Sequence, residues 1–297
     1  MKKLGEKIKN IRRSKGLTQN ELAEGICTQA TVSNLENGAS LPSVTTLLAI
    51  ADRLKINFSE ISDYMPTNDN SFIEIFNQVK ALCNKGEYKK AQTLLKKSIK
   101  LDKLERDYEI KEYYYYLGLT SLVGEGNYSD AHYNFNLALF SETGKKLDII
   151  DVLTTNGIAV AYFLNDELDK AHVYFTKSIA QLEELRSAGD HLLDSMEVIK
   201  IYFNTAKYYS ATENYKKAIE FCTIGIKLQQ KEDKMHGLEN LLYEKAHNLF
   251  KLENVKEAED YYFHALSVSM LNKNDELTET LKKELAKNKI NSYSYKY

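Results

Sequence analysis

Amide, hydroxyl and methyl side chains gather between residues 28 and 34, and the chemistry they could perform is hydrogen bonding rather than covalent catalysis. A glutamine such as Gln29 can form two hydrogen bonds with the edge of an adenine, and the methyl groups of Ala30 and Thr31 can contact a thymine methyl group. Thr28 and Asn34 flank them with further hydrogen-bonding groups. These residues could contact base edges if one element presented them together.

Asn156 and Asn204 form a second candidate group. Each lies in the middle of a segment whose apolar periodicity predicts a helix, where asparagine has a poor intrinsic propensity. That local cost favours a hydrogen-bonding role for both amides. The partner is either the backbone of a bound peptide or a polar group on a neighbouring helix, and the sequence leaves both alternatives open.

No pattern in the sequence predicts an enzyme. The chain has no nucleophile motif, no phosphate-binding glycine loop and no metal-ligand cluster, so we expect no catalytic residue, no metal and no cofactor. Its three cysteines are isolated and odd in number, which is typical of reduced thiols in a cytoplasmic protein. A signal peptide and a membrane-spanning apolar run are both absent from the sequence. We therefore expect a cytoplasmic protein with no membrane partner.

The helices that must position the first group lie in residues 1–64. Apolar periodicity predicts five short helices there, the fourth opening at Pro42 and the fifth near Phe58. Thr18 and Glu21 predict a capping box at the start of the second helix. The third is predicted from about Gln29 to Glu36, with Thr28 as its N-cap, so residues 28–34 form its N-terminal half.

Charge is spread unevenly along the chain. The whole sequence has a net charge of −2, yet residues 1–15 sum to +6 and residues 1–64 to +2. A locally basic end on an acidic body suits a protein that contacts a polyanion with one domain only. A solvated amphipathic first helix is the alternative that charge alone leaves open.

The segments LTQNELAEGI and TQATVSNLENGASLPSVTTLLAIADRL resemble the xenobiotic-response-element/lambda-repressor-like helix-turn-helix family. The resemblance implies that the third helix lies in the major groove of double-stranded DNA. It assigns base contacts to the start of that helix, namely Thr28, Gln29, Ala30, Thr31 and Asn34. It assigns phosphate contacts to residues at helix ends nearby, namely Arg13, Gln19, Ser33 and Asn37.

A polar segment with a proline predicts a linker at 65–71, and a repeat pattern fills residues 72–297. Five copies pair a turn with an alanine and a long amphipathic helix, and the alanines are 40, 40, 47 and 40 residues apart. They are Ala91, Ala131, Ala171, Ala218 and Ala258. The pattern resembles the tetratricopeptide repeat. We therefore expect an all-α chain, with the helix-turn-helix domain followed by a right-handed superhelix of five tetratricopeptide-like hairpins.

The first helices of these hairpins are expected to line a concave face that holds an extended peptide. Its candidate peptide-binding residues are Tyr115, Asn156, Lys200, Asn204, Lys207, Tyr243, Glu244 and His247.

The whole chain resembles the Rap/Rgg/NprR/PlcR/PrgX group of Gram-positive quorum-sensing proteins, most clearly at KLGEKIKNIRRSKGLTQNELAEGIC, TTNGIAVAY and YFNTAKYY. The resemblance implies a homodimer that binds a palindromic operator under the control of a short signalling peptide. Asn156 and Asn204 match peptide-contacting asparagines of the group, whereas Glu244 replaces a glutamine of the PlcR branch. Two alternatives stay open: the repeats bind a protein partner, or they only dimerise a constitutive repressor.

Overall fold

The computed structural model describes residues 2–40, 42, 44–56, 70–104, 106–140, 147–187, 195–231 and 237–288. The chain divides into two compact units, residues 1–74 and 75–297. The predicted fifth helix near Phe58 and most of the predicted linker 65–71 lie outside the described residues. Within these ranges the structure holds helices and no strand, in line with the predicted all-α class.

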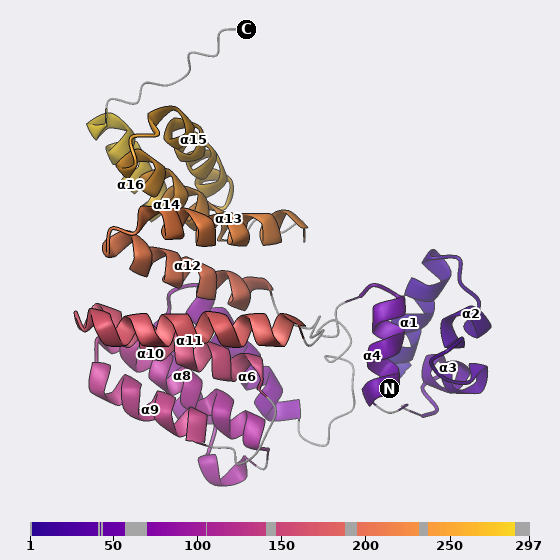
Figure 1. Ribbon diagram of the computed structural model, residues 1–297. Helices are drawn as coiled ribbons and strands as arrows, with labels where there is room; N and C mark the ends of the chain where they lie inside the picture. Colours follow the sequence, from indigo (N-terminus) through magenta and orange to yellow (C-terminus); the bar gives the residue numbers. More distant parts are fainter. Residues whose placement is uncertain are drawn as a thin grey trace, which may run out of the picture. The chain divides into compact units, whose positions relative to one another are not determined.

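In the first unit, the described residues form four short helices around one apolar core (Figure 1). They are α1 (Lys2–Ser14), α2 (Gln19–Ala23), α3 (Gln29–Glu36) and α4 (Val44–Arg53). Both predicted caps are confirmed: Thr18 and Glu21 form a reciprocal capping box, and the Thr28 hydroxyl accepts a hydrogen bond from the Thr31 amide. The core side chains are fully buried at Leu4, Ile8, Leu22, Val32, Leu47, Ile50 and Leu54.

Gly5 lets α1 and α3 cross at very short range. A Cβ atom at this position would collide with the backbone carbonyl groups of Leu35 and Glu36 at the end of α3. Only glycine fits such a close approach of two backbones. The position of α3 on the surface of the unit therefore depends on Gly5, which lies 24 positions before the first residue of α3.

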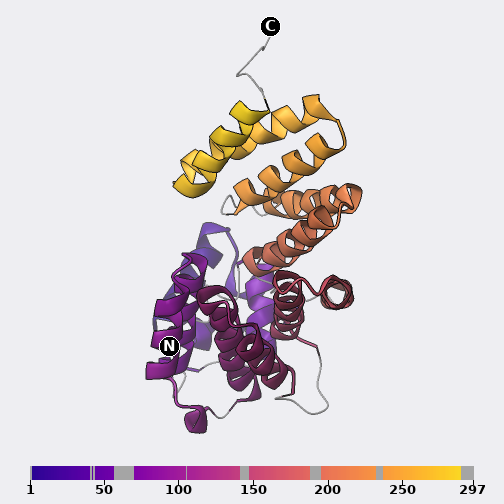
Figure 2. The same ribbon diagram turned by 90° about the vertical axis from the view of Figure 1, so that its left-hand side faces the viewer.

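The second unit contains the five predicted hairpins (Figures 1 and 2). Their first helices are α6 (Asn70–Asn84), α8 (Asp107–Glu125), α10 (Ile149–Leu164), α12 (Ser195–Ala211) and α14 (Leu238–Lys251). Their second helices are α7 (Tyr88–Ser98), α9 (Tyr128–Phe140), α11 (Leu168–Ser187), α13 (Tyr215–Lys231) and α15 (Val255–Leu271). A short 3-10 turn, η1 (Leu101–Lys103), follows α7. An additional helix, α16 (Asp275–Lys287), packs against α15 and was not among the predicted elements.

Close helix crossings hold each hairpin together. All five repeat alanines are fully buried, as their proposed role at the crossing requires. In the second hairpin the Phe135 ring of α9 packs over two glycines: a Cβ added at Gly118 of α8 or at Gly157 of α10 would approach ring carbons to 2.6 Å. Phe135 thus joins three helices of two successive hairpins.

The first helices also contact one another from hairpin to hairpin, since α8 touches α10, α10 touches α12 and α12 touches α14. This continuous inner layer carries the side chains predicted to bind a ligand. In the described part of the chain, no helix is both long and apolar enough to cross a bilayer.

Candidate DNA interface and ligand cavity

Helix α3 presents a polar outer face at its N-terminal end. Val32 and Leu35 point into the core, whereas Gln29, Ala30 and Asn34 are exposed. Thr28 is exposed as well, and its hydroxyl lies 2.9 Å from that of Thr31. All five residues predicted to contact bases therefore lie together on one element, with hydrogen-bonding groups and methyl groups available to a partner.

A buried hydrogen-bond network fixes the start of this helix. The Arg12 guanidinium donates two hydrogen bonds to the Glu36 carboxylate, one of them 3.0 Å long at Oε2. Gln19 donates to the same carboxylate at 2.8 Å, and the Gln29 side-chain amide donates to the Gln19 side-chain oxygen Oε1 at 2.7 Å. The amide of Gln29 is thus bound to Gln19 and is linked through it to Glu36 at the end of α3 and to Arg12 of α1.

Burial of Glu36 would by itself raise its pKa, but the hydrogen bonds from Arg12 and Gln19 outweigh that effect and lower it. The pKa of Arg12 is raised by the same hydrogen bond and charge. Sequence reasoning missed Arg12 as a network member. A signal was present, because Arg12 follows Leu4 and Ile8 at intervals of four and so falls on the buried stripe of α1, where a cation needs a partner.

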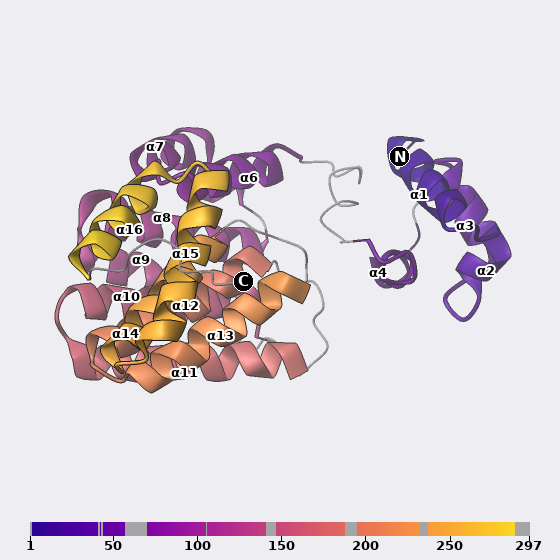
Figure 3. The same cartoon turned by 90° about the horizontal axis from the view of Figure 1, so that it is seen from above.

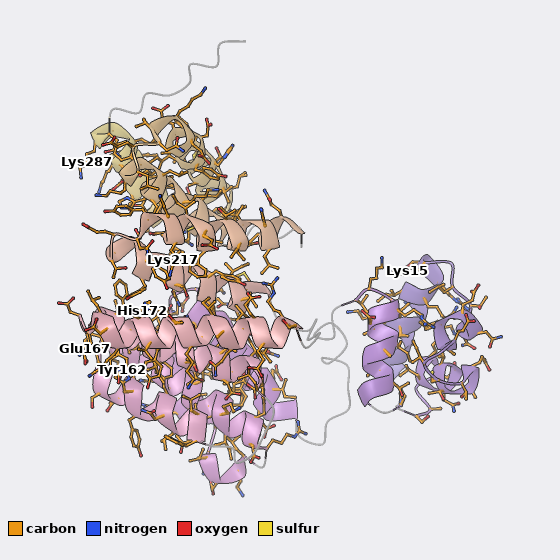
Figure 4. The ribbon with its side chains drawn as sticks, viewed as in Figure 1. Lys15, Tyr162, Glu167, His172, Lys217 and Lys287 are labelled. Carbon is orange, nitrogen blue, oxygen red and sulfur yellow. The ribbon has the colours of Figure 1, made fainter. Side chains whose placement is uncertain are left out.

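The residues predicted to contact phosphate occupy three places. Gln19 lies in the network just described, beside Gln29. Ser33 and Asn37 lie at the other end of α3, with the Asn37 amide 3.5 Å from the Ser33 hydroxyl. Arg13 is exposed near the end of α1, close in sequence to Lys15, which points away from the unit (Figure 4).

Asn156 and Asn204 meet between hairpins 3 and 4. The Asn204 side-chain amide donates to the Asn156 side-chain oxygen Oδ1 at 2.9 Å, and Asn156 Nδ2 donates to the Ser178 hydroxyl at 3.1 Å. Asn156 is 2 % exposed, and both ends of its amide are engaged. It fits the alternative of a satisfied amide between helices. Asn204 is the partly exposed member and the one accessible to a ligand.

One ion pair and one hydrogen bond join hairpin 1 to hairpin 4, and we call these two contacts the α6–α12 bridge. The Lys80 ammonium lies 2.7 Å from the Glu197 carboxylate, and the predicted ligand residue Lys200 donates to the Asn84 side chain at 2.6 Å. Glu112 of α8 lies near this bridge. Burial and the Glu197 carboxylate raise the pKa of Glu112 to about 8.

A cavity of about 630 Å³ lies on the inner layer between hairpins 3, 4 and 5, within the usual size range of small-ligand sites. Four predicted residues line it: Lys207, Tyr243, Glu244 and His247. Four others do not. Asn156, Asn204 and Lys200 have the contacts described above, and Tyr115 is buried against the Phe135 ring. Four of the eight predicted ligand residues therefore line the cavity, and the other four lie outside its lining.

The cavity also contains residues that sequence reasoning missed. Phe163 and Phe203 supply aromatic surface, Lys251 supplies a cation, and Leu277 is contributed by α16. Lys251 lies four positions after His247 on α14, so helical spacing could have identified it. Leu277 could not have been found, because α16 was not predicted. Figure 4 labels Tyr162, Glu167 and His172 in hairpin 3, outside this cavity lining.

Residues 8–61 match the helix-turn-helix family model (HTH_3), so this part of the chain is a helix-turn-helix domain. No curated protein sequence is significantly similar to the chain.

Solved structures of similar fold cover nearly the whole chain. PlcR from Bacillus thuringiensis, in complex with the peptide PapR7 and DNA, is 25% identical over 95% of this chain and 99% of PlcR, with a TM-score of 0.66. ComR from S. thermophilus, in complex with DNA and its signalling peptide ComS, is 17% identical over 95% and 98% of the two chains, with a TM-score of 0.55.

The SHP pheromone receptor Rgg2 from Streptococcus dysgalactiae is 15% identical, covers 96% of this chain and 99% of its own, and has a TM-score of 0.50. The whole-chain resemblance drawn from the sequence is confirmed. These relatives are DNA- and peptide-bound proteins and a pheromone receptor, not enzymes.

Proposed function

We propose that this chain, a helix-turn-helix protein with the fold of PlcR, is a cytoplasmic transcriptional regulator whose DNA binding is controlled by a short signalling peptide. The domain assignment 1–64, 65–71 and 72–297 belongs to the same proposal. A homodimer places two copies of α3 on a palindromic operator, one or more helical turns apart. The peptide lies along the inner layer of the repeats.

One observation supports both halves of this proposal. The chain combines an exposed, capped α3, whose outer face carries the side chains predicted to contact bases, with a cavity on the inner layer of the repeats. Aromatic walls at Phe163 and Phe203 suit apolar peptide side chains, and the partly exposed amide of Asn204 suits a peptide backbone group.

Control of DNA binding requires that the peptide bind one arrangement of the two DNA-binding domains better than the other. Coupling of this kind is reciprocal, so DNA should change peptide affinity by the same factor that peptide changes DNA affinity. That reciprocity allows the coupling to be measured from either side.

The test is a DNA-binding titration at a stated salt concentration, using an operator duplex recovered by selection from a random pool. Peptides encoded by small open reading frames beside the gene are added at saturation. We expect one of them to change operator affinity by at least about fivefold, the lower end of typical coupling free energies. If no peptide changes operator affinity, peptide control is wrong.

Asn204→Ala is expected to weaken the peptide response without weakening DNA binding in the absence of peptide. Its matched control is Asn136→Ala, an exposed asparagine on the outer helix α9 whose amide donates only to a backbone carbonyl group. An Asn204→Ala chain that responds to peptide like the wild type would exclude this residue from the peptide site.

A further inference from the structure

The outer face of hairpin 1 carries a concentration of positive charge far from α3 in the sequence. Residues 85–106 contain eight lysines and arginines and three carboxylates, a net charge of +5. The rest of the chain beyond residue 64 is acidic. We define the hairpin-1 basic face as Lys85, Lys89, Lys90, Lys96, Lys97 and Lys100, all of which are exposed.

Helix geometry gathers four of these lysines on one side of α7. At 100° per residue, Lys89 and Lys96 lie within about 20° of each other, and Lys90 and Lys97 form a second pair beside them. Ala91 and Leu95, which are fully buried, lie on the opposite side of the helix. The four ammonium groups therefore point outward from the repeat unit, and α7 lies at its periphery (Figure 3).

Most of the second helices of the other hairpins do not share this charge. Helix α7 has four lysines and no carboxylate, whereas α9 has one aspartate and no lysine or arginine, and α15 has more carboxylates than cations. Helix α13 also has four lysines, but it carries a glutamate, whereas Lys85 and Lys100 add further cations beside α7. Lys90 of this face lies 2.5 Å from the Glu87 carboxylate one turn earlier, and Arg106 lies 3.7 Å from Glu109 at the start of α8. Repeat packing alone does not require such a face.

We propose that the hairpin-1 basic face contacts the phosphate backbone of duplex DNA flanking the operator. The inference rests on the proposed function, because it needs the helix-turn-helix domain to bring DNA to the chain. Lysine ammonium groups on an exposed helix suit phosphate contacts that carry no base specificity. The domain and hairpin 1 are also close along the chain: even fully extended, the backbone from Ile56 to Asn70 spans at most about 50 Å.

The test compares two duplexes, one limited to the selected operator and one extended by about 15 base pairs on each side. The wild-type chain is expected to bind the extended duplex more tightly and with a steeper dependence on salt. Lys89→Gln with Lys96→Gln should reduce the slope of log K against log salt for the extended duplex by about 1.8, because each phosphate contact contributes about 0.9. Binding to the short duplex should not change.

The matched control is Lys216→Gln with Lys227→Gln, which removes the same charge from one side of α13. Lys216 occupies the same repeat position as Lys89, and both control lysines are exposed. The control variant should bind both duplexes like the wild type. Far-UV circular dichroism checks that each variant is folded.

Equal salt slopes for wild type and the Lys89/Lys96 variant on the extended duplex would overturn the inference. The hairpin-1 basic face would then be a candidate site for an acidic protein surface and not for DNA. Equal losses in both double variants would overturn it too, since they would indicate a general charge effect. If the wild type selects no DNA sequence at all, the proposed function fails, and this inference fails with it.

Discussion

Among single residues, Glu36 has two structural roles. It neutralises Arg12, whose guanidinium is largely buried, and it holds Gln19, which in turn holds Gln29 at the start of α3. A residue in the core of the helix-turn-helix domain thereby orients a side chain that we propose contacts bases. A change at Glu36 should therefore affect both the stability of the domain and its base preference.

Glu36→Gln is expected to lower the free energy of unfolding of the domain by about 3 kcal/mol, because it leaves the Arg12 charge buried without a carboxylate. The folded-state pKa of Glu36 is lowered, so its stabilising contribution is present at neutral pH and is lost as the pH falls through that folded-state value. The difference between wild type and variant should therefore shrink in acid.

Hydrogen exchange of the α1 and α3 amides at several pH values, corrected for intrinsic rates, measures this difference. Glu24→Gln is the control, because Glu24 is exposed on the same domain. Equal protection of the wild-type and Glu36→Gln domains at neutral pH would show that the buried ion pair contributes nothing to stability.

Among the secondary-structure elements, glycines determine how closely neighbouring helices pack. Gly118 and Gly157 leave the space that the Phe135 ring fills, so hairpins 2 and 3 are joined by one aromatic side chain and two missing Cβ atoms. The same principle places α3 against α1 at Gly5. In both units, the close contact between helices depends on glycines, which act only by leaving space for the neighbouring helix.

Gly118→Ala is expected to destabilise the repeat unit by about 1–3 kcal/mol, because its Cβ atom would lie 2.6 Å from the Phe135 ring. The measurement is urea unfolding followed by far-UV circular dichroism. A double-mutant cycle with Phe135→Leu supplies the control: in the alanine background, the smaller side chain should cost less than it does in the wild type. Additive effects would mean that the two residues do not touch.

At the scale of the whole molecule, the sequence predicted the features that a local or regularly spaced pattern marks, namely helix caps and repeated hairpins. The caps at Thr18 and Thr28 and the five alanines each mark a local pattern, and the structure confirms all of them. The cavity could not be predicted in the same way. Its lining combines residues from several helices, and the contribution of Leu277 depends on α16, a helix that has no repeat alanine to mark it.

Asn156 shows the same limit for a single side chain. Its residue type and mid-helix position were visible in the sequence, but the choice between a ligand contact and an interhelical hydrogen bond depends on Ser178 and Asn204, which lie 22 and 48 residues away. Spacing along one helix carries no information about such partners.

The α6–α12 bridge has a consequence for how the repeat unit folds and melts. In an open array of repeats, stability is a sum of nearest-neighbour terms, and unfolding can begin at either end. Here Lys200 and Asn84 are 116 residues apart, so hairpins 1 and 4 are linked directly. Because the entropy of closing that long loop is lost before the contact forms, we expect the bridge to form late in folding.

Hairpins 1–4 should therefore open as one cooperative block, while hairpin 5 and α16 fray independently. Glu197→Gln combined with Asn84→Ala removes both contacts of the bridge and is expected to break that block. Amide exchange in α6 should then approach the rate of terminal fraying, and exchange in α15 should stay unchanged. If α6 and α15 respond alike, the array is an ordinary open chain of repeats. If α6 alone responds, the two contacts of the bridge join the ends of the first four hairpins, and only hairpin 5 and α16 remain a free end of the array.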